Sequence, residues 1–305
     1  MNYVDQLKAL QKASGLSQEQ LAVRLDVSFA TLNSWINNRS QPRTSAKERI
    51  NKLYLETVGI DNVDEQTLHT TKQAALGLKM TAQGISSNKE HLEKLTIHLT
   101  YHTNTIEGST MTLADVEDVL FDHKVLSNRT AIEQAEARNH QAALYWLLDE
   151  LTTKGKDFEI NEDFVLNLHL RLMNGIIGDA GQYRKHPVRI MGTRVPLANW
   201  QKVPQLMLEM SKELRKPHKD TISLIAQTHA QFEKIHPFSD GNGRTGRLIM
   251  LTQALHAGLM PPLVVKDRRF AYYKYLELAQ TKGNNKPLEL FVAESMRLTA
   301  KLLNG

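Results

Sequence analysis

The sequence predicts an all-α protein. Most segments carry apolar residues at three- and four-residue spacing, which is the period of a helix with one buried face. Segments that alternate apolar and polar residues, as half-buried strands do, are sparse. Hydrophobic residues make up 41% of the chain and charged residues 23%, which supplies ample material for a core. With 305 residues, the chain is long enough for one large domain or two smaller ones.

Composition also excludes several classes of protein. The chain has no cysteine, which excludes disulfides, thiolate nucleophiles and cysteine-ligated metals and suits a reducing cytoplasm. The start, MNYVDQLKAL, lacks the basic region and apolar run of a signal peptide. No apolar stretch approaches the ~20 residues needed to span a bilayer. We therefore expect a cytoplasmic protein with no membrane partner. The formal net charge of +5 permits an anionic partner without requiring one.

Residues 1–60 are predicted to form a small helical domain. Leu7 and Leu10 share one face of a first helix, and Ser17 and Ser28 stand where they can cap two short helices that follow. The strings GLSQEQLA, DVS and NNRSQP resemble the helix-turn-helix of the lambda-repressor-like (XRE) DNA-binding family. The resemblance covers residues 7–42.

This resemblance implies DNA as a partner of residues 1–60. Eight Lys or Arg against five Asp or Glu leave this segment with a net charge of +3, and its basic residues gather after the second short helix. The residues implied to face DNA are Ser28, Phe29, Ala30, Asn33, Ser34 and Arg39. Binding to a palindromic site would favour a homodimer. The alternative is a protein-interaction module with a solvated basic face.

The rest of the chain divides into a polar helical connector, residues 61–100, and a large domain, residues 101–305. The helices predicted from residue 88 onward are 88–104, 112–121, 130–153, 161–174, 201–215, 219–235, 244–257, 268–282 and 287–302. One stretch differs from this pattern. In residues 183–197, two prolines, a Gly192 turn and alternating apolar residues predict a short β-hairpin.

One string, HPFSDGNGRTGR at residues 236–247, carries the chemistry. It lies between two predicted helices, so its glycines stand at a helix amino terminus. Backbone N–H groups can converge there, and the helix dipole favours negative charge. Arg244 and Arg247 are three residues apart and share a helix face, which suits more than one phosphate.

The same string holds one carboxylate and one imidazole. A carboxylate beside phosphates is repulsive unless a cation joins them, so Asp240 predicts Mg²⁺ bound between its oxygens and the phosphates. His236 is then left to accept a proton from an attacking hydroxyl. Phe238 is expected to point into the core and anchor the loop.

The string matches in full the signature H-x-F-x-D/E-G-N-G-R-x-x-R of the Fic (filamentation induced by cAMP) family. The resemblance extends over about residues 90–300 and includes GQYRKHPVRI and RRFAYYKYLELA. It implies a Fic-fold helical domain that uses ATP and Mg²⁺ to transfer AMP to a Ser, Thr or Tyr hydroxyl of a protein target. His236 is then the general base and Asp240 the metal ligand. The implied nucleotide-binding residues are Phe238, Gly241, Asn242, Gly243, Arg244, Arg247, Tyr272 and Tyr273. For the two tyrosines, core packing is an equal alternative.

Two further features follow from this resemblance. The Doc-type branch, which phosphorylates its target, carries lysine where this chain has Gly243, so the glycine favours nucleotidyl transfer. The predicted hairpin corresponds to a flap that holds the target segment as an added strand. The implied flap residues are Val188, Arg189, Ile190, Met191, Gly192 and Thr193.

The stretch TNTIEGST contains a third feature. Thr103, Glu107 and Gly108 match the T-x-x-x-E-G inhibitory motif of Fic proteins whose regulatory helix precedes the catalytic core. The resemblance implies that Glu107 pairs with Arg247 and misaligns ATP. The alternative is an ordinary surface ion contact. In some relatives the same glutamate supports removal of AMP, and the sequence leaves that activity open.

Several readings compete with this one. The chain could be a DNA-binding regulator whose Fic-like domain only senses nucleotide, although a sensor has no need of the intact His236. It could also transfer UMP or a phosphocholine group. A zinc site built on paired histidines is not supported, because no carboxylates stand nearby in a metal-binding pattern. Glu136 and Asn139 are assigned only structural roles.

Overall fold

The computed structural model describes residues 2–61, 63–190, 193 and 195–305, and over these residues its regular structure is helical apart from one isolated bridge. The all-α prediction is therefore confirmed. The chain divides into two compact units, residues 1–62 with 267–275, and residues 63–266 with 276–305. Each unit is described by itself. Among the described residues, no helix combines the length and the apolar character that crossing a membrane requires.

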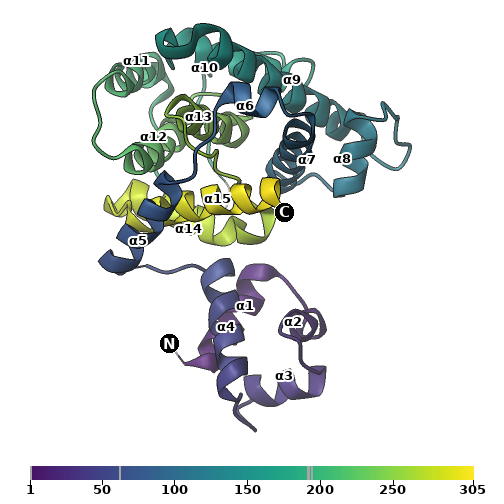
Figure 1. Cartoon of the computed structure of the whole chain (residues 1–305). Helices are drawn as coiled ribbons and strands as arrows, with labels where there is room; N and C mark the ends of the chain where they lie inside the picture. The colour runs from purple at the N-terminus through teal and green to yellow at the C-terminus, as the bar shows by residue number, and fades with distance from the viewer. Residues whose placement is uncertain (1, 62, 191–192, 194) are drawn as a thin grey trace. The chain divides into compact units, whose positions relative to one another are not determined.

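The first unit is built on four helices, drawn in purple and blue in Figure 1. They are α1 (Tyr3–Ser14), α2 (Gln18–Arg24), α3 (Phe29–Ile36) and α4 (Thr44–Thr57). Ser17 and Gln20 form a capping box at the start of α2, and Ser28 caps α3 by accepting from the Thr31 N–H. Between them Asp26 adopts a left-handed backbone, with φ 55°, and turns the chain. The buried core comprises Leu7, Leu10, Leu21, Ala22, Leu25, Leu32, Trp35, Ala46 and Ile50.

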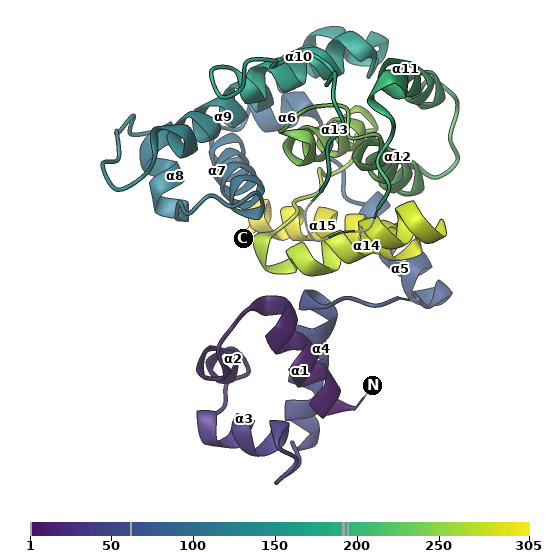
Figure 2. The ribbon, with the colours of Figure 1, turned by 180° about the vertical axis from the view of Figure 1, so that it is seen from behind.

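The second unit is built around one central helix, α13 (Asn242–His256), which is buried along almost its whole length. The other helices are α5 (Glu65–Leu76), α6 (Ala82–Ser86), α7 (Lys89–Ile106), α8 (Leu113–Leu120), α9 (Ala131–Lys154), α10 (Glu162–Met173), α11 (Val203–Leu214), α12 (Thr221–Ile235), α14 (Arg269–Lys282) and α15 (Lys286–Asn304). Helices α7, α9, α10 and α12 pack against α13, as the front and back views show (Figures 1 and 2). The first residues of α14 group with the first unit.

Residues 63–88, expected to be part of a connector, pack into the second unit. Helix α5 lies against α15, and residues 78–80 pair with residues 258–260 through an isolated antiparallel bridge. The Lys72 ammonium is nearly buried and contacts Asp220 Oδ2 at 2.5 Å and Glu289 Oε2 at 2.6 Å. One lysine of α5 therefore joins the starts of α12 and α15.

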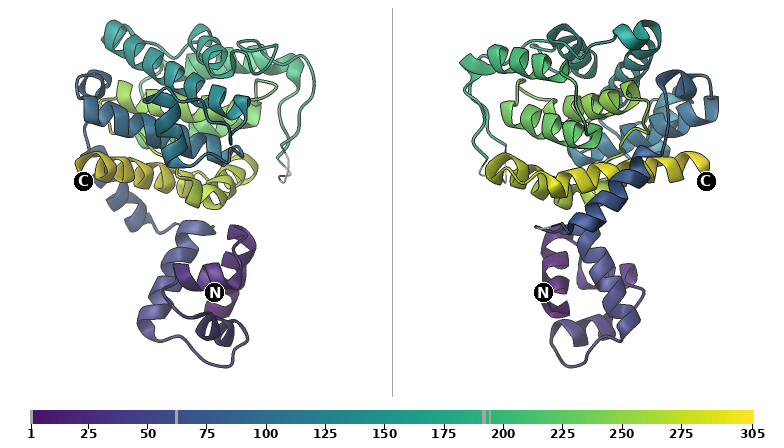
Figure 3. Two further views of the ribbon diagram at one scale, coloured as in Figure 1. Left: turned by 90° about the vertical axis from the view of Figure 1, so that its right-hand side faces the viewer. Right: turned by 60° about the vertical axis from the view of Figure 1, so that its left-hand side comes forward.

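The predicted β-hairpin is wrong for the residues that can be compared. No described residue of 183–197 lies in a strand, and Met191 and Gly192 lie outside the described residues. Figure 3 shows the described residues of this stretch, which lies between α10 and α11 in the chain, without helix. Its ends bond elsewhere, since Arg184 N donates to Pro237 O at 2.9 Å and Ala198 N donates to Lys234 O at 3.2 Å. Main-chain groups at both ends are thus tied to the end of α12.

We expect Lys72→Ala to lower the free energy of unfolding by about 3–5 kcal/mol, because it leaves two carboxylates close together with no cation between them. Urea unfolding followed by circular dichroism measures this. Lys89→Ala is the matched control, since Lys89 has an 86% exposed side chain and its loss should cost under ~1 kcal/mol. Equal effects of the two substitutions would contradict the role given to Lys72.

Candidate active site

The string HPFSDGNGRTGR forms the junction between two buried helices. Helix α12 ends at Ile235, and His236 caps it with a left-handed backbone of φ 50° and ψ 63°. Gly241 stands at the N-cap of α13 with φ 77°, where a side chain would be strained. Because glycine offers no side-chain acceptor, the first N–H groups of α13 can serve an anion.

Asn242 holds this loop in shape. Its buried side chain donates from Nδ2 to Phe238 O at 2.9 Å and accepts at Oδ1 from Phe238 N, also at 2.9 Å. Both polar atoms of the amide are therefore engaged with the backbone of one loop residue. In this structure the side chain of Asn242 shapes the loop, and main-chain N–H groups are left to face a ligand.

Phe238 anchors the loop in the core, where the sequence places it. Its ring is fully buried and stacks on His169 of α10, with ring centroids 3.6 Å apart and planes 3° from parallel. The Gly181 N–H donates to His169 Nδ1 at 2.9 Å, so Nε2 carries the proton and donates to Asp240 O at 3.0 Å. Burial lowers the pKa of His169 to about 4, which keeps the ring neutral. Sequence reasoning did not identify His169.

The glycines at positions 241 and 243 are closely surrounded. A Cβ on Gly241 would lie 2.6 Å from Met173 Sδ, which no real contact allows. A Cβ on Gly243 would lie 2.3 Å from Glu107 Oε1. A side chain at either position would therefore require Met173 or Glu107 to move, and at Gly241 the backbone φ of 77° adds strain.

His236 projects from the left-handed cap of α12. Its Nδ1 lies 3.2 Å from Glu233 O, which assigns the proton to Nδ1 and leaves Nε2 as the basic nitrogen. Burial lowers the pKa of His236 to about 4, so the imidazole is neutral at neutral pH. A neutral imidazole with an acceptor nitrogen can take a proton from a hydroxyl.

Glu233 lies beneath this histidine and was not identified from the sequence. It is buried on α12, and its Oε2 lies 3.7 Å from His236 Nδ1. Burial raises the pKa of Glu233 to about 8, against the weaker opposing effect of the Arg247 charge. The side chain is therefore a neutral carboxylic acid at pH 7.

Arg247 is paired with the end of α7. Its NH2 lies 2.6 Å from Glu107 Oε1, and its Nε donates to Thr103 Oγ1 at 2.7 Å. Thr103 and Glu107 are one turn apart on the same helix face, so one guanidinium reaches both. Gly108 follows with φ 110°, which is open only to glycine and turns the chain away. The ion pair implied by the T-x-x-x-E-G motif is present.

Arg244 is also paired with a carboxylate. Arg244 NH1 lies 2.6 Å from Glu136 Oε1 on α9, and its NH2 lies 3.6 Å from Asp240 Oδ2. Glu136 thus contacts a signature arginine, although sequence reasoning gave it only a structural role. The side chain of Asp240 is 62% exposed and offers hard oxygen donors. One such carboxylate beside substrate phosphates is a donor set that Mg²⁺ accepts, so the residues fit this ion.

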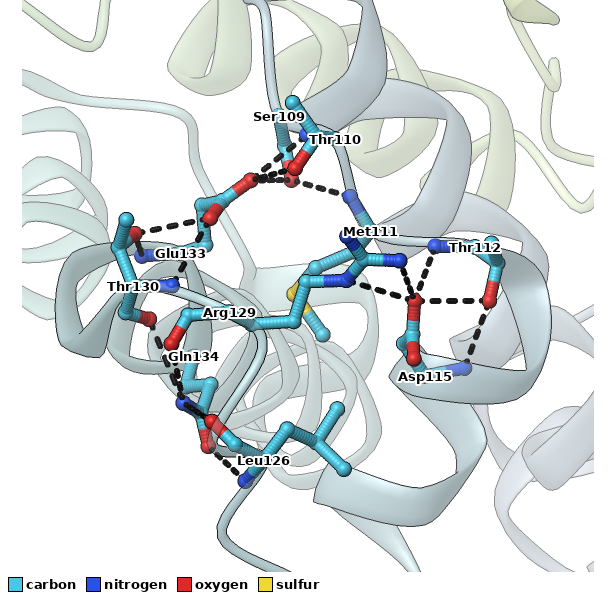
Figure 4. Close-up of polar contacts among 10 residues, drawn as sticks. All are labelled: Ser109, Thr110, Met111, Thr112, Asp115, Leu126, Arg129, Thr130, Glu133 and Gln134. Atoms are coloured by element: carbon cyan, nitrogen blue, oxygen red, sulfur yellow. Dashed lines mark hydrogen bonds and ion pairs between the residues drawn. The ribbon is translucent and has the colours of Figure 1, made fainter.

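The turn that follows Glu107 is fixed to α9 by a polar cluster (Figure 4). Glu133 Oε1 accepts from Thr110 N at 2.7 Å, Thr110 Oγ1 at 2.9 Å and Ser109 Oγ at 3.3 Å. The Thr110 N–H bond is the main cause that lowers the pKa of Glu133 to about 2. Nearby, Arg129 pairs with Asp115 at 2.6 Å. This cluster keeps the Glu107 turn in a defined position.

Four of the six predicted flap residues are among the described residues and line one cavity. Val188, Arg189, Ile190 and Thr193 line a cavity of about 520 Å³ together with Trp200. Met191 and Gly192 lie outside the described residues.

Tyr272 is buried and Tyr273 is 44% exposed on the part of α14 that groups with the first unit, and their role in an adenine pocket stays a prediction. In the first unit, Ser28, Phe29, Ala30 and Arg39 are exposed, whereas Asn33 and Ser34 are half-buried.

Two parts of the chain match models of known protein families. Residues 159–254 match the model of the Fic/DOC family, and residues 7–50 match the helix-turn-helix model. The chain is 28% identical over 247 residues to the protein adenylyltransferase Fic of Drosophila erecta, covering 80% of this chain and 49% of the relative. It is 29% identical over 249 residues to the same protein of Drosophila melanogaster, again covering 80% and 49%. The chain spans about half the length of these curated relatives.

A solved structure shares the fold. Fic-1 (residues 134–508) from C. elegans superposes with a TM-score of 0.65 over 98% of this chain and 96% of that chain, at 21% sequence identity.

We expect Glu233→Gln to change how stability depends on pH. The folded protein holds a proton on Glu233 up to a pKa of about 8, whereas an unfolded glutamate releases it near 4.5. The parent should therefore lose stability relative to the variant as pH rises between these values, by up to about 1.4 kcal/mol per pH unit. Urea unfolding across this range measures the difference. Glu90→Gln is the control, since the Glu90 side chain is 71% exposed, and its stability should depend on pH as that of the parent does. If the stability of Glu233→Gln also ran parallel to that of the parent across this range, the raised pKa of Glu233 would be contradicted.

Proposed function

We propose that this chain, which carries a Fic/DOC domain behind a helix-turn-helix domain, is an autoinhibited protein adenylyltransferase. It would transfer AMP from ATP to a Ser, Thr or Tyr hydroxyl of a protein, which could be the chain itself. The observation that carries the proposal is the neutral His236 imidazole held beside the amino terminus of α13, whose first turns carry two buried arginines, Arg244 and Arg247. This set offers a base and an anion cradle in one place.

In the proposed reaction, the target hydroxyl oxygen attacks the α-phosphorus of ATP and pyrophosphate leaves. His236 Nε2 accepts the hydroxyl proton as the new P–O bond forms. Arg244 and Arg247 neutralise the outer phosphates. Main-chain N–H groups of Asn242 and Gly243 hold the α-phosphate region, since the Gly241 N–H donates to Asp240 Oδ1 at 2.6 Å. Mg²⁺ held by Asp240 would offset the phosphate charge. The chemistry is mostly positioning and charge neutralisation, which these groups supply.

We infer that Glu107 holds this site inactive. Arg247 cannot donate to the γ-phosphate while its NH2 is 2.6 Å from the Glu107 carboxylate. The carboxylate would also repel that phosphate, so ATP would bind with its α-phosphorus out of line. A misplacement of ~1 Å can cost ~100-fold in rate.

Glu107→Gly should raise self-labelling and target labelling by on the order of 100-fold, because it frees Arg247 for the phosphate. Mass spectrometry after incubation with Mg·ATP measures the extent of labelling and identifies the transferred group and the acceptor residue. His236→Ala in the same background is the control and should remove the label. Equal labelling of parent and Glu107→Gly at saturating Mg·ATP would reject the inhibitory role.

The mass of the adduct also separates the remaining alternatives. A UMP or phosphocholine adduct would replace AMP in the proposal. Loss of a preformed AMP group from a labelled target would reveal de-AMPylation.

The absence of cysteine suits a cytoplasmic location.

A second function is favoured by the first unit. The exposed start of α3, with Ser28, Phe29 and Ala30, is followed by exposed Arg39, and a short exposed helix start of this kind suits the major groove. We propose that this unit binds DNA, and that a palindromic site would bring two copies together as a homodimer. A regulator that only senses nucleotide would share this unit but would not label protein.

Binding of variants to DNA sites selected from a random pool should show which side chains contact bases and which contact phosphates. Arg39→Ala should weaken binding to all sequences alike and reduce the salt dependence by about one phosphate contact. Asn33→Ala should cost about 1–3 kcal/mol at one base position and relax specificity there. Fluorescence anisotropy at several salt concentrations measures both effects. Glu56→Ala on α4 is the charged control, and a pool that yields no selected site would contradict DNA binding.

A further inference from the structure

Arg184 is a buried guanidinium, and each of its three nitrogens donates to a main-chain carbonyl. Its residue is only 2% exposed. Nε donates to His236 O at 2.7 Å, NH1 donates to His186 O at 2.8 Å, and NH2 donates to Ala198 O at 2.7 Å and to Ile235 O at 3.3 Å. Burial lowers the pKa of this group from its usual value, although an arginine stays charged.

The position of this charge is explained by the end of α12. The last carbonyls of a helix have no partner within it and carry the negative end of the helix dipole. Ile235 and His236 are the last residue and the cap of α12, so their carbonyls suit a buried cation. The backbone of Arg184 adds a further bond from its N–H to Pro237 O at 2.9 Å. Arg184 therefore holds the left-handed cap from which the His236 imidazole projects.

The same guanidinium also holds both ends of another segment. His186 and Ala198 flank residues 187–197, which include the flap residues that the family resemblance assigns to docking the target. Their carbonyls accept from NH1 and NH2 of one planar group, so the two ends are fixed relative to each other and to the His236 carbonyl. One planar guanidinium therefore connects three separate stretches of main chain.

We propose that Arg184 is a positioning residue that fixes the His236 imidazole and the two ends of the target-docking segment relative to one another. The segment between them would then present an acceptor hydroxyl from ends that are fixed relative to the His236 main chain. The inference rests on the proposed transferase function. It assigns Arg184 no contact with ATP, because its donors are used by carbonyls.

The test compares Arg184→Lys with its parent in the Glu107→Gly background. Lysine keeps the charge but carries its three N–H groups on one nitrogen, so it cannot reach all of these carbonyls as the planar guanidinium does. We expect kcat for AMP transfer to fall by on the order of 100-fold while KM for ATP stays within about threefold. Arg215→Lys is the matched control, since Arg215 is 51% exposed and lies at the end of α11. A parent-like kcat, or a rise in KM that accounts for the loss, would overturn the proposal.

A second measurement does not depend on activity. In Arg184→Lys, amide hydrogen exchange should increase by on the order of tenfold or more in both residues 184–190 and residues 236–241, while the interior of α9 stays protected. Exchange that is unchanged in either stretch would overturn the inference even if no transfer were detected in the parent. A parent without transfer but with the paired exchange effect would instead count against the transferase function alone.

Discussion

The junction between α12 and α13 is the constraint on which the site depends. The chain must leave one buried helix and enter another within residues 236–241, and a left-handed residue stands at each end of that loop. Side chains from elsewhere in the unit bond its main chain, with Asn242 at Phe238 and His169 at Asp240. Because these contacts are buried, the loop is fixed before any ligand arrives, and its N–H groups need little reorganisation to meet an anion.

The electrostatics of this junction depends on which charged side chains are already paired with other side chains of the protein. Both signature arginines are nearly buried, and each is paired with a carboxylate at 2.6 Å, Arg244 with Glu136 and Arg247 with Glu107. Glu133, one turn before Glu136 on α9, holds the turn that follows Glu107. Helix α9 therefore contacts Arg244 directly, through Glu136. It affects Arg247 indirectly, because Glu133 holds the turn that follows Glu107. Phosphates would have to compete with these contacts, and the partly exposed Glu107 (34%) is easier to displace than the more buried Glu136 (17%).

The sequence was sufficient for elements that depend on local signals. Capping serines and helical periodicity located α2, α3 and α9 within a few residues, and the signature string located the loop. Residues whose roles depend on tertiary approach were missed. His169 and Glu233 each resemble an ordinary helical side chain until burial changes their protonation. The hairpin was wrong because its alternating pattern does not reveal that main-chain groups at its ends bond to α12 and the following loop.

Gly243 links the choice of reaction to the means of control. The space that a Cβ would need at this position is occupied by the Glu107 carboxylate, 2.3 Å away. A lysine at this position, as in the phosphorylating branch, would exclude the carboxylate from that volume. A lysine at residue 243 would therefore require the Glu107 carboxylate to leave the position in which it pairs with Arg247. The residue at this one position thus bears both on the reaction and on how the site is restrained.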